Sequence, residues 1–379
     1  MHFGFTEEQE ELREMARAFL SECSSSEQVH EAMEMPEGFD PKVWERIAAE
    51  LGWPAVIVPE EYGGIGMTYV ELIALMEEMG KALLCSPFFS TVCLAVNTLL
   101  EAGTEEQKQA LLPEIAEGQQ TATLAFSEDS GRWDAGAVEA IAKKDGDGFV
   151  LSGRKSFVVD GHTADQLIIA ARSEGSQGEE GISLFLVKSD TPGIERKKLA
   201  TMDQTRVHAS VDLQDVKVPA SALMGEEGTA WPALKRSLDL AAIALAAEQV
   251  GGAQRCLDMS VEYAKERVQF GRKIGSFQAM KHKCANMSLQ VESARSAVYY
   301  ASWAAAEKEP DLSELASIAK AYASDTYFFC AGASIQVHGG VGFTWEYDCH
   351  LYFKRANSSQ VFLGSPEYHR ELVAQHMGL

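Results

Sequence analysis

The chain has 379 residues, of which 46% are hydrophobic, so it can bury a large core and divide into two or three domains. Its 33 lysines and arginines oppose 56 aspartates and glutamates, and the formal charge is −23. That charge repels nucleic acid and anionic membranes, so neither is expected as a partner. An anionic cofactor would need local basic residues or helix N-termini.

The cysteines and the N-terminus point to a reducing, cytoplasmic environment. The seven cysteines are odd in number and scattered, without CxxC pairs or zinc-ligand spacing. The N-terminus is acidic where a signal peptide carries positive charge, and no apolar run approaches the roughly 20 residues of a membrane helix. We therefore expect a cytoplasmic protein without a membrane segment.

The pattern of apolar residues changes twice along the chain. Residues 1–121 have helical spacing, starting with a capping box of Thr6 and Gln9. Residues 122–225 contain short β-rich runs broken by Gly, Asp and Pro. Residues 226–379 return to helical spacing, including a helix behind a second capping box of Asp311 and Glu314. The strands are expected at 148–151, 156–159, 166–171, 182–187 and 211–218.

The order helix, sheet, helix predicts an α+β protein with segregated layers, because a doubly wound sheet needs alternating strands and helices. Val56–Val58 followed by the glycines of 63–66 resembles the start of a dinucleotide-binding fold. The third glycine is missing, since residue 69 is Tyr, and no βαβ unit follows. A surface turn is the better interpretation. The chain also has no GxSxG or HExxH motif to indicate a hydrolase or a metalloenzyme.

A basic island stands out in the acidic chain within the segment 263–274 and the adjoining Phe277-Gln278. Arg267, Arg272 and Lys273 lie close together, and Phe270 is placed among them where it can stack on a flat ring. Spacing alone favours a solvated charge cluster over a binding site.

A second segment, 335–343, carries two adjacent glycines at the end of a helical pattern. Gly339 and Gly340 would let backbone N–H groups approach a pyrophosphate, with Gln336 as a further donor. Here too the alternative is structural, an ordinary helix C-cap.

Together these segments resemble the C-terminal signatures of acyl-CoA dehydrogenases, and the resemblance extends over nearly the whole chain. Further matching stretches are 58–64, 152–172, 215–228 and 249–255. The resemblance implies an N-terminal helical domain (1–121), a central β-barrel (122–225) and a C-terminal four-helix bundle (226–379). It also implies a tetramer that binds FAD at subunit interfaces and passes electrons to an electron-transfer flavoprotein or a similar acceptor.

In this family a carboxylate removes the α-proton of an acyl-CoA while the β-hydride passes to FAD, which yields an enoyl-CoA. The usual base lies in a Glu-Gly-Thr turn, which matches Leu363-Gly364-Ser365 here. The alternative base position, on the first long helix of the C-terminal domain, falls on Ala241. Both positions therefore lack a carboxylate, and we predict that the chain has no catalytic residue at either.

The residues that the resemblance assigns to FAD fall into an altered group and an intact group. The loop that matches 127–134 has Arg132 and Trp133 in place of small residues, and the family's Trp-x-Thr matches 157–159, with Val159 replacing a hydroxyl. The expected cofactor-binding residues of this region are Phe126, Ser127, Phe157 and Val159. The intact group, which in the family reaches the FAD of a neighbouring subunit, consists of Arg267, Phe270, Gln278, Gln336, Gly339 and Gly340.

This asymmetry leads to the hypothesis that the chain resembles the non-catalytic, smaller subunit of α2β2 acyl-CoA dehydrogenases that oxidise bulky, often steroid-derived, acyl-CoA side chains. A homologous subunit would supply the base. Two alternatives stay open, a self-sufficient homotetrameric dehydrogenase with a relocated base and a flavin-dependent monooxygenase on the same scaffold. Among candidate bases, Glu367 fits a first-turn helix acid behind Ser365 and Pro366. Asp239 and Glu248 lie off the right helical position.

Overall fold

The structure is a computed structural model that describes residues 5–379. Its contacts divide the chain into two compact units. Unit 1 comprises residues up to 31, 68–84 and 242–379, and unit 2 comprises 32–67 and 85–241. Each unit therefore unites segments that are distant in sequence, whereas the three consecutive domains expected from the sequence stay a prediction.

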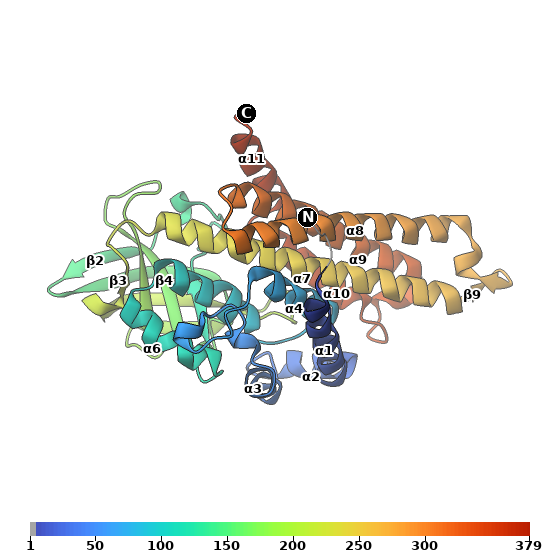
Figure 1. The fold of residues 1–379 in the computed structure, drawn as a ribbon, viewed down its shortest axis with the longest axis horizontal. Coiled ribbons are helices and arrows are strands. Elements are labelled where there is room, and N and C mark those ends of the chain that lie inside the picture. The colour runs from blue at the N-terminus through green and yellow to red at the C-terminus, as the bar shows by residue number, and fades with distance from the viewer. Residues whose placement is uncertain (1–4) are drawn as a thin grey trace. The chain divides into compact units, whose positions relative to one another are not determined.

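In chain order, helices precede and follow a strand-rich segment (Figure 1). The α-helices are α1 (Glu7–Cys23), α2 (Ser26–Glu34), α3 (Pro41–Ala49), α4 (Tyr69–Lys81), α5 (Asn97–Ala102), α6 (Glu105–Ala116), α7 (Trp231–Glu266), α8 (Gln278–Glu307), α9 (Leu312–His338), α10 (Cys349–Val361) and α11 (Pro366–His376). The strands are β1 (Ala122–Ala125), β2 (Ile141–Asp145), β3 (Gly148–Val159), β4 (Gln166–Ser173), β5 (Ile182–Lys188), β6 (Ile194–Lys198), β7 (His208–Pro219), β8 (Leu223–Met224), β9 (Val268–Gln269) and β10 (Arg272–Lys273).

Unit 1 is helical, and α8, α10 and α11 each pack against α9. Glycines allow α4 to cross α7 in backbone contact. A Cβ added to Gly80 would lie 2.0 Å from the carbonyl oxygen of Glu248, and one added to Gly251 would lie 1.8 Å from that of Glu77. A side chain at either glycine would therefore separate the two helices.

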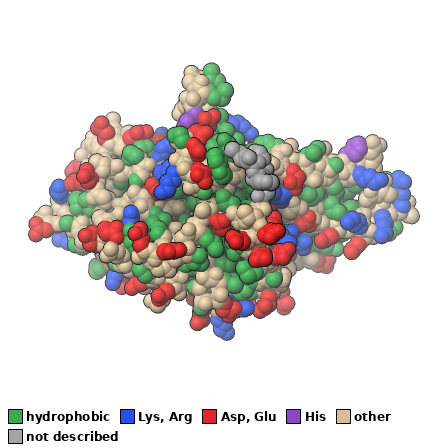
Figure 2. Space-filling model, viewed as in Figure 1, with side chains coloured by type: hydrophobic (Ala, Val, Ile, Leu, Met, Phe, Trp, Pro, Cys, Tyr) green, Lys and Arg blue, Asp and Glu red, His purple; other side chains and the backbone are tan. Residues whose placement is uncertain are grey.

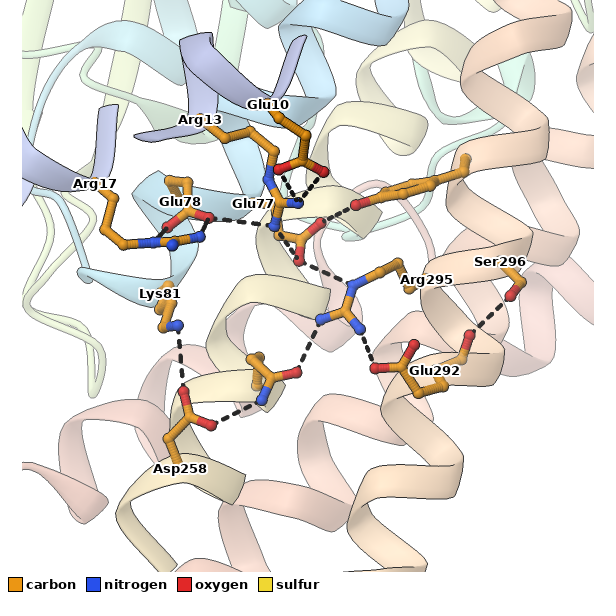
Figure 3. A network of polar contacts seen from close by, with 12 residues as sticks. Glu10, Arg13, Arg17, Glu77, Glu78, Lys81, Asp258, Glu292, Arg295 and Ser296 are labelled. Atoms are coloured by element: carbon orange, nitrogen blue, oxygen red, sulfur yellow. Dashed lines mark hydrogen bonds and ion pairs between the residues drawn. The ribbon is translucent and has the colours of Figure 1, made fainter. Parts of the chain in front are cut away.

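A buried ionic network holds α1 and α8 against α4 in unit 1 (Figure 3). Arg13 lies 3.5 Å from Glu77 and 3.3 Å from Glu78, Arg17 lies 2.8 Å from Glu78, and Arg295 lies 3.0 Å from Glu77. Both glutamates are only 3% exposed. Because a buried carboxylate without a partner costs several kcal/mol, α4 needs these arginines in order to stay buried.

Unit 2 contains the larger sheet, whose strands follow the order β6-β7-β3-β2-β4-β5-β8, with β1 parallel to β4. The long antiparallel pair β3–β7 shifts register between Leu151 and Gly153 and again between Lys155 and Val158. The strand segments predicted from alternating residues fall within β3, β4, β5 and β7. The two register shifts bend β3 where the loop after β1 meets it.

The structure confirms some local sequence signals and corrects others. The side chains of Thr6 and Gln9 form the expected capping box of α1. The expected capping box of Asp311 and Glu314 is wrong, because Asp311 caps α9 without a side-chain hydrogen bond and its backbone is not extended (ψ 14°). Val56–Val58 forms no strand, which removes the dinucleotide-fold interpretation. No helix between residues 5 and 379 combines the length and apolar character needed to cross a bilayer.

Candidate functional site

A cavity of about 600 Å³ lies in unit 1 beside the end of α7, the β9–β10 hairpin and the end of α9. Its lining brings together Arg267, Phe270, Gly339 and Gly340, which the sequence placed in two separate segments. A Cβ built on either glycine would meet no atom within 4 Å. The backbone of both glycines is therefore open to a molecule in the cavity.

Phe270 occupies the tip of the hairpin and is 90% exposed. Phe270 and Gly271 both have positive φ, 54° and 74°, as the type I′ turn of a two-residue hairpin requires. For a phenylalanine this conformation costs about 1–2 kcal/mol. A strained and solvated aromatic ring adds little to the folded chain, so its position favours a role in contact with another molecule.

Basic side chains surround this hairpin. Residues 263–283 contain six lysines and arginines and one acid, in a chain whose net charge is −23. At the right-hand edge of Figure 2, blue side chains are gathered over the hairpin. The Arg272 guanidinium lies over the ring of Phe277, 4.0 Å from its centroid. The cavity therefore combines positive charge with apolar walls, which suits an anionic molecule that carries a flat ring.

Two further lining residues, Tyr263 and His338, lie within the segments 263–274 and 335–343 but had been assigned no role. The rings of Tyr263 and His338 stack with centroids 4.3 Å apart, and both line the cavity. Burial lowers the pKa of His338, which favours the neutral form of its ring. The predicted Gln278 and Gln336 are exposed beside this region, at the first residue of α8 and near the end of α9.

A backbone turn between α10 and α11 carries Leu363, one of the two positions where the sequence analysis looked for a base. Leu363 is buried and has φ of 60°, and Gly364 has φ of 103°. The imidazole Nε2 of His369 lies 2.9 Å from the carbonyl oxygen of Leu363, and Lys320 Nζ lies 3.0 Å from that of Gly364. The turn is therefore clamped, but the side chain that it presents cannot accept a proton.

The carboxylates considered as relocated bases all have structural partners. Glu248 forms a buried pair with Arg355 at 2.7 Å, and Asp239 accepts from Lys235 at 2.9 Å. Glu367 follows the N-cap Ser365 in the first turn of α11, as predicted, and bonding to its own backbone N–H lowers the pKa of its carboxyl. Ala241, the second predicted base position, is a buried apolar residue on α7. Each carboxylate is thus already engaged by an arginine, a lysine or a helix N-terminus, which indicates a structural role.

In unit 2 the loop after β1 lies against β3. The amide N–H of Ser156 donates to the carbonyl oxygen of Ser127 at 2.9 Å. The Trp133 ring stacks on Phe126, with centroids 5.7 Å apart and an interplanar angle of 28°. Arg132 turns to solvent and pairs with Asp134 at 2.7 Å. The tryptophan therefore fills space beside Phe126.

A buried ion pair, also missed by sequence analysis, secures this loop. Lys155 is fully buried, and its Nζ donates to Glu128 Oε1 at 2.5 Å and to the carbonyl oxygen of Phe126 at 3.3 Å. Glu128 also accepts from the amides of Glu139 and Ala140, each at 3.0 Å. These bonds compensate for burying two charges and fix the path of the loop.

The remaining predicted residues of unit 2 lie on β3. Phe157 has φ of 56° and is 46% exposed, and its carbonyl oxygen lies 3.0 Å from His208 Nδ1. Val159 is buried, and its carbonyl oxygen accepts from the Thr123 hydroxyl at 2.7 Å. An exposed ring on a left-handed residue again favours contact with another molecule.

Among residues 5–379, no three His, Cys, Asp or Glu side chains are grouped so that they could hold a metal ion.

Three family models match consecutive parts of the chain. The N-terminal domain of acyl-CoA dehydrogenases matches residues 6–119, the middle domain matches 123–216, and the C-terminal domain matches 228–378. The acyl-CoA dehydrogenase IpdE2 of Mycolicibacterium smegmatis is 37% identical over 371 residues, which cover 98% of this chain and 99% of that protein.

Solved structures agree with these matches. Butyryl-CoA dehydrogenase from Megasphaera elsdenii is similar over 100% of both chains, with a TM-score of 0.92 and 30% identity. A chain of the ChsE4-ChsE5 complex from Mycobacterium tuberculosis is similar over 100% of this chain and 99% of its own length, with a TM-score of 0.90 and 26% identity. The α+β fold predicted from the sequence is thereby confirmed, and the chain belongs to the acyl-CoA dehydrogenase family of FAD-dependent oxidoreductases.

Proposed function

We propose that this chain is the subunit without a catalytic base in a hetero-oligomeric acyl-CoA dehydrogenase. In this role it completes an FAD site whose flavin ring and base belong to a homologous subunit. The observation that carries the proposal is the turn at Leu363. Its left-handed backbone and both of its carbonyl clamps are in place, yet the side chain is a leucine. An alkyl group cannot remove the α-proton of a thioester.

The cavity of unit 1 supports the cofactor part of the proposal. Arg267 would pair with the diphosphate of FAD, the open backbone of Gly339 and Gly340 would approach it, and Phe270 would lie against the adenine. Gln278 and Gln336 would add side-chain donors at the rim. FAD, when bound, supplies the hydride acceptor of the reaction. This chain's own residues there bind and orient the cofactor.

The loop of unit 2 supports the other half of the proposal. By the resemblance, Phe126, Ser127, Phe157 and Val159 would lie beside the flavin ring of this chain's own FAD. Trp133 packs on Phe126 beside them. Val159 offers an alkyl side chain in place of a hydroxyl, so it provides no hydrogen bond to a flavin nitrogen. We infer that the chain binds the ring of its own FAD poorly.

The partner in this proposal is a homologous acyl-CoA dehydrogenase subunit that carries the base. The solved ChsE4-ChsE5 complex is a relative assembled from two named chains, which supports a hetero-oligomer over a homotetramer. The complete enzyme would bind an acyl-CoA and pass its electrons to an electron-transfer flavoprotein or a similar acceptor.

The test is the FAD content of the chain purified alone. The protein is incubated with excess FAD, freed of unbound cofactor by gel filtration, and its visible spectrum gives the FAD bound per chain. Butyryl-CoA dehydrogenase from Megasphaera elsdenii, treated in the same way, is the positive control. We expect well under one FAD per chain here. One firmly bound FAD per chain, together with turnover of an acyl-CoA, would overturn the proposal.

A further inference from the structure

Lys320, on α9, is a fully buried lysine whose hydrogen-bond partners are all neutral. Its Nζ lies 3.0 Å from Ser324 Oγ, 3.1 Å from the carbonyl oxygen of Gln360 and 3.0 Å from that of Gly364. An ammonium group has three N–H donors, and three acceptors surround this one. No carboxylate is hydrogen-bonded to this amine, which is an unusual and costly environment for a buried lysine.

Two of these acceptors belong to the segment that ends α10 and begins the turn. Gln360 is in the last turn of α10, where carbonyl groups lack helical partners and attract a cation. Gly364 follows Leu363, whose φ of 60° costs a non-glycine residue about 1–2 kcal/mol. The turn therefore needs support from outside its own backbone, and Lys320 and His369 provide it.

The third acceptor anchors Lys320 to the interior of the bundle. The hydroxyl of Ser324 donates to Gln249 Oε1 at 3.1 Å, and Gln249 Nε2 donates to the carbonyl oxygen of Ser359 at 3.0 Å. The donors run in one direction from Lys320 on α9, through Gln249 on α7, to α10. Such a satisfied buried network fixes the position of the amine relative to all three helices.

We propose that Lys320 is a positioning residue that sets the direction of the side chain at position 363 by holding the carbonyl groups of Gln360 and Gly364. Only the role of position 363 rests on the proposed function; the contacts of Lys320 do not. Lys320 has no exposed surface, so an external carbonyl compound cannot reach its amine to form a Schiff base. Its effect must therefore act through the turn.

Hydrogen exchange of the full chain tests this assignment without cofactor or substrate. The amide of Gly364 donates to Val361 at 3.2 Å and the amide of Phe362 donates to Ser358 at 3.2 Å, so both report on the turn. Lys320→Met keeps the aliphatic stem and removes the donors. We expect these two amides to exchange about tenfold faster in Lys320→Met, because their carbonyl neighbours lose buried partners. Exchange in the middle of α8 stays as in the wild type.

Two further variants separate positioning from a general loss of stability. Lys320→Arg keeps a cation and should restore most of the protection at the turn. Ser334→Ala removes another buried hydroxyl from α9. That hydroxyl contacts Cys349 and not the turn, so the variant should leave the exchange rates of the two amides unchanged. If Lys320→Met does not fold, Ser324→Ala removes one acceptor and should accelerate the same amides to a smaller extent.

The assignment is wrong if neither Lys320→Met nor Ser324→Ala changes exchange at the turn, or if Ser334→Ala accelerates the two amides equally. Neither result bears on the FAD content of the chain, so the proposed function can fail or stand separately.

Discussion

Each unit of the molecule uses a fully buried lysine to secure a loop, but the two lysines are satisfied differently. In unit 2, Lys155 pairs with the carboxylate of Glu128 and holds the loop after β1. In unit 1, Lys320 binds a hydroxyl and two carbonyl groups and holds the turn at Leu363. Burial lowers the pKa of both amines, and that of Lys320 falls to about 7.

The comparison shows that the scaffold and the chemistry of a site can be separated. Both loops have buried anchors, while the side chains that they present differ from those that the resemblance predicts. Leu363 stands in one turn at the position where the resemblance predicts a base, and Trp133 stands in the other loop where it predicts a small residue. A buried anchor stabilises the fold of this chain whatever its activity, whereas a base is needed only in a subunit that performs the chemistry.

The largest expected effect follows from breaking the anchor that contains two charges. Lys155→Met leaves Glu128 buried with backbone donors only, so we expect the free energy of unfolding to fall by about 3–5 kcal/mol. Urea denaturation measures it. Replacing both partners, with Lys155→Met and Glu128→Gln together, removes both charges and should recover part of this loss. A double variant less stable than Lys155→Met would contradict the description of the anchor as an ion pair.

The anchor whose partners are all neutral should cost less to remove. Lys320→Met deprives two carbonyl groups and a hydroxyl of a donor but also removes a buried charge, so we expect a loss of about 1–3 kcal/mol near pH 7. Urea denaturation again gives the value. If Lys320→Met lost as much free energy of unfolding as Lys155→Met, the two anchors would contribute equally to stability despite their different hydrogen-bond partners.

The anchors should also differ in pH dependence. The pKa of Lys320 is about 7 in the folded chain, below its ordinary value near 10.5. Between these values the unfolded chain binds more protons, so the residue's contribution to stability rises with pH across this window. The cost of burying the charge is complete below pH 7. The stability of the wild type relative to Lys320→Met should rise with pH, by at most about 1.4 kcal/mol per unit. If the difference in stability between the wild type and Lys320→Met stayed constant from pH 7 to 10, the lowered pKa of Lys320 would be excluded.

The smallest effect is expected at the exposed hairpin of unit 1. Phe270→Gly relieves a positive φ, and the ring that it removes is 90% exposed. We expect stability to change by less than about 1 kcal/mol, in the direction of a gain. Thermal denaturation checks the direction. A clear loss would show that Phe270 packs within the chain, and the proposed contact with FAD would lose its support.

Local sequence motifs predicted the helix starts, because these depend on neighbouring residues. Thr6 with Gln9 marked the start of α1, and Ser365 with Pro366 marked the start of α11. The resemblance to the family pointed to residues in two separate segments, and four of those residues line one cavity. The contact of Lys320 with Gly364 could not be predicted from the sequence. The two residues are 44 positions apart, and no local sequence motif marks either of them. Asp311 was misread because a capping box also requires an extended backbone.

The absence of a base is the central claim, and anaerobic addition of acyl-CoA to the FAD-loaded chain tests it most directly. Because the chain is expected to bind FAD weakly, it is kept in a large excess of FAD and the bound fraction is measured first. It is then titrated with butyryl-CoA and with a bulky steroid-derived acyl-CoA while the absorbance of the bound flavin is followed. We predict no bleaching with either, because Leu363 and Ala241 cannot accept the α-proton. Rapid bleaching would contradict the account and would show that another carboxylate of this chain performs the proton abstraction.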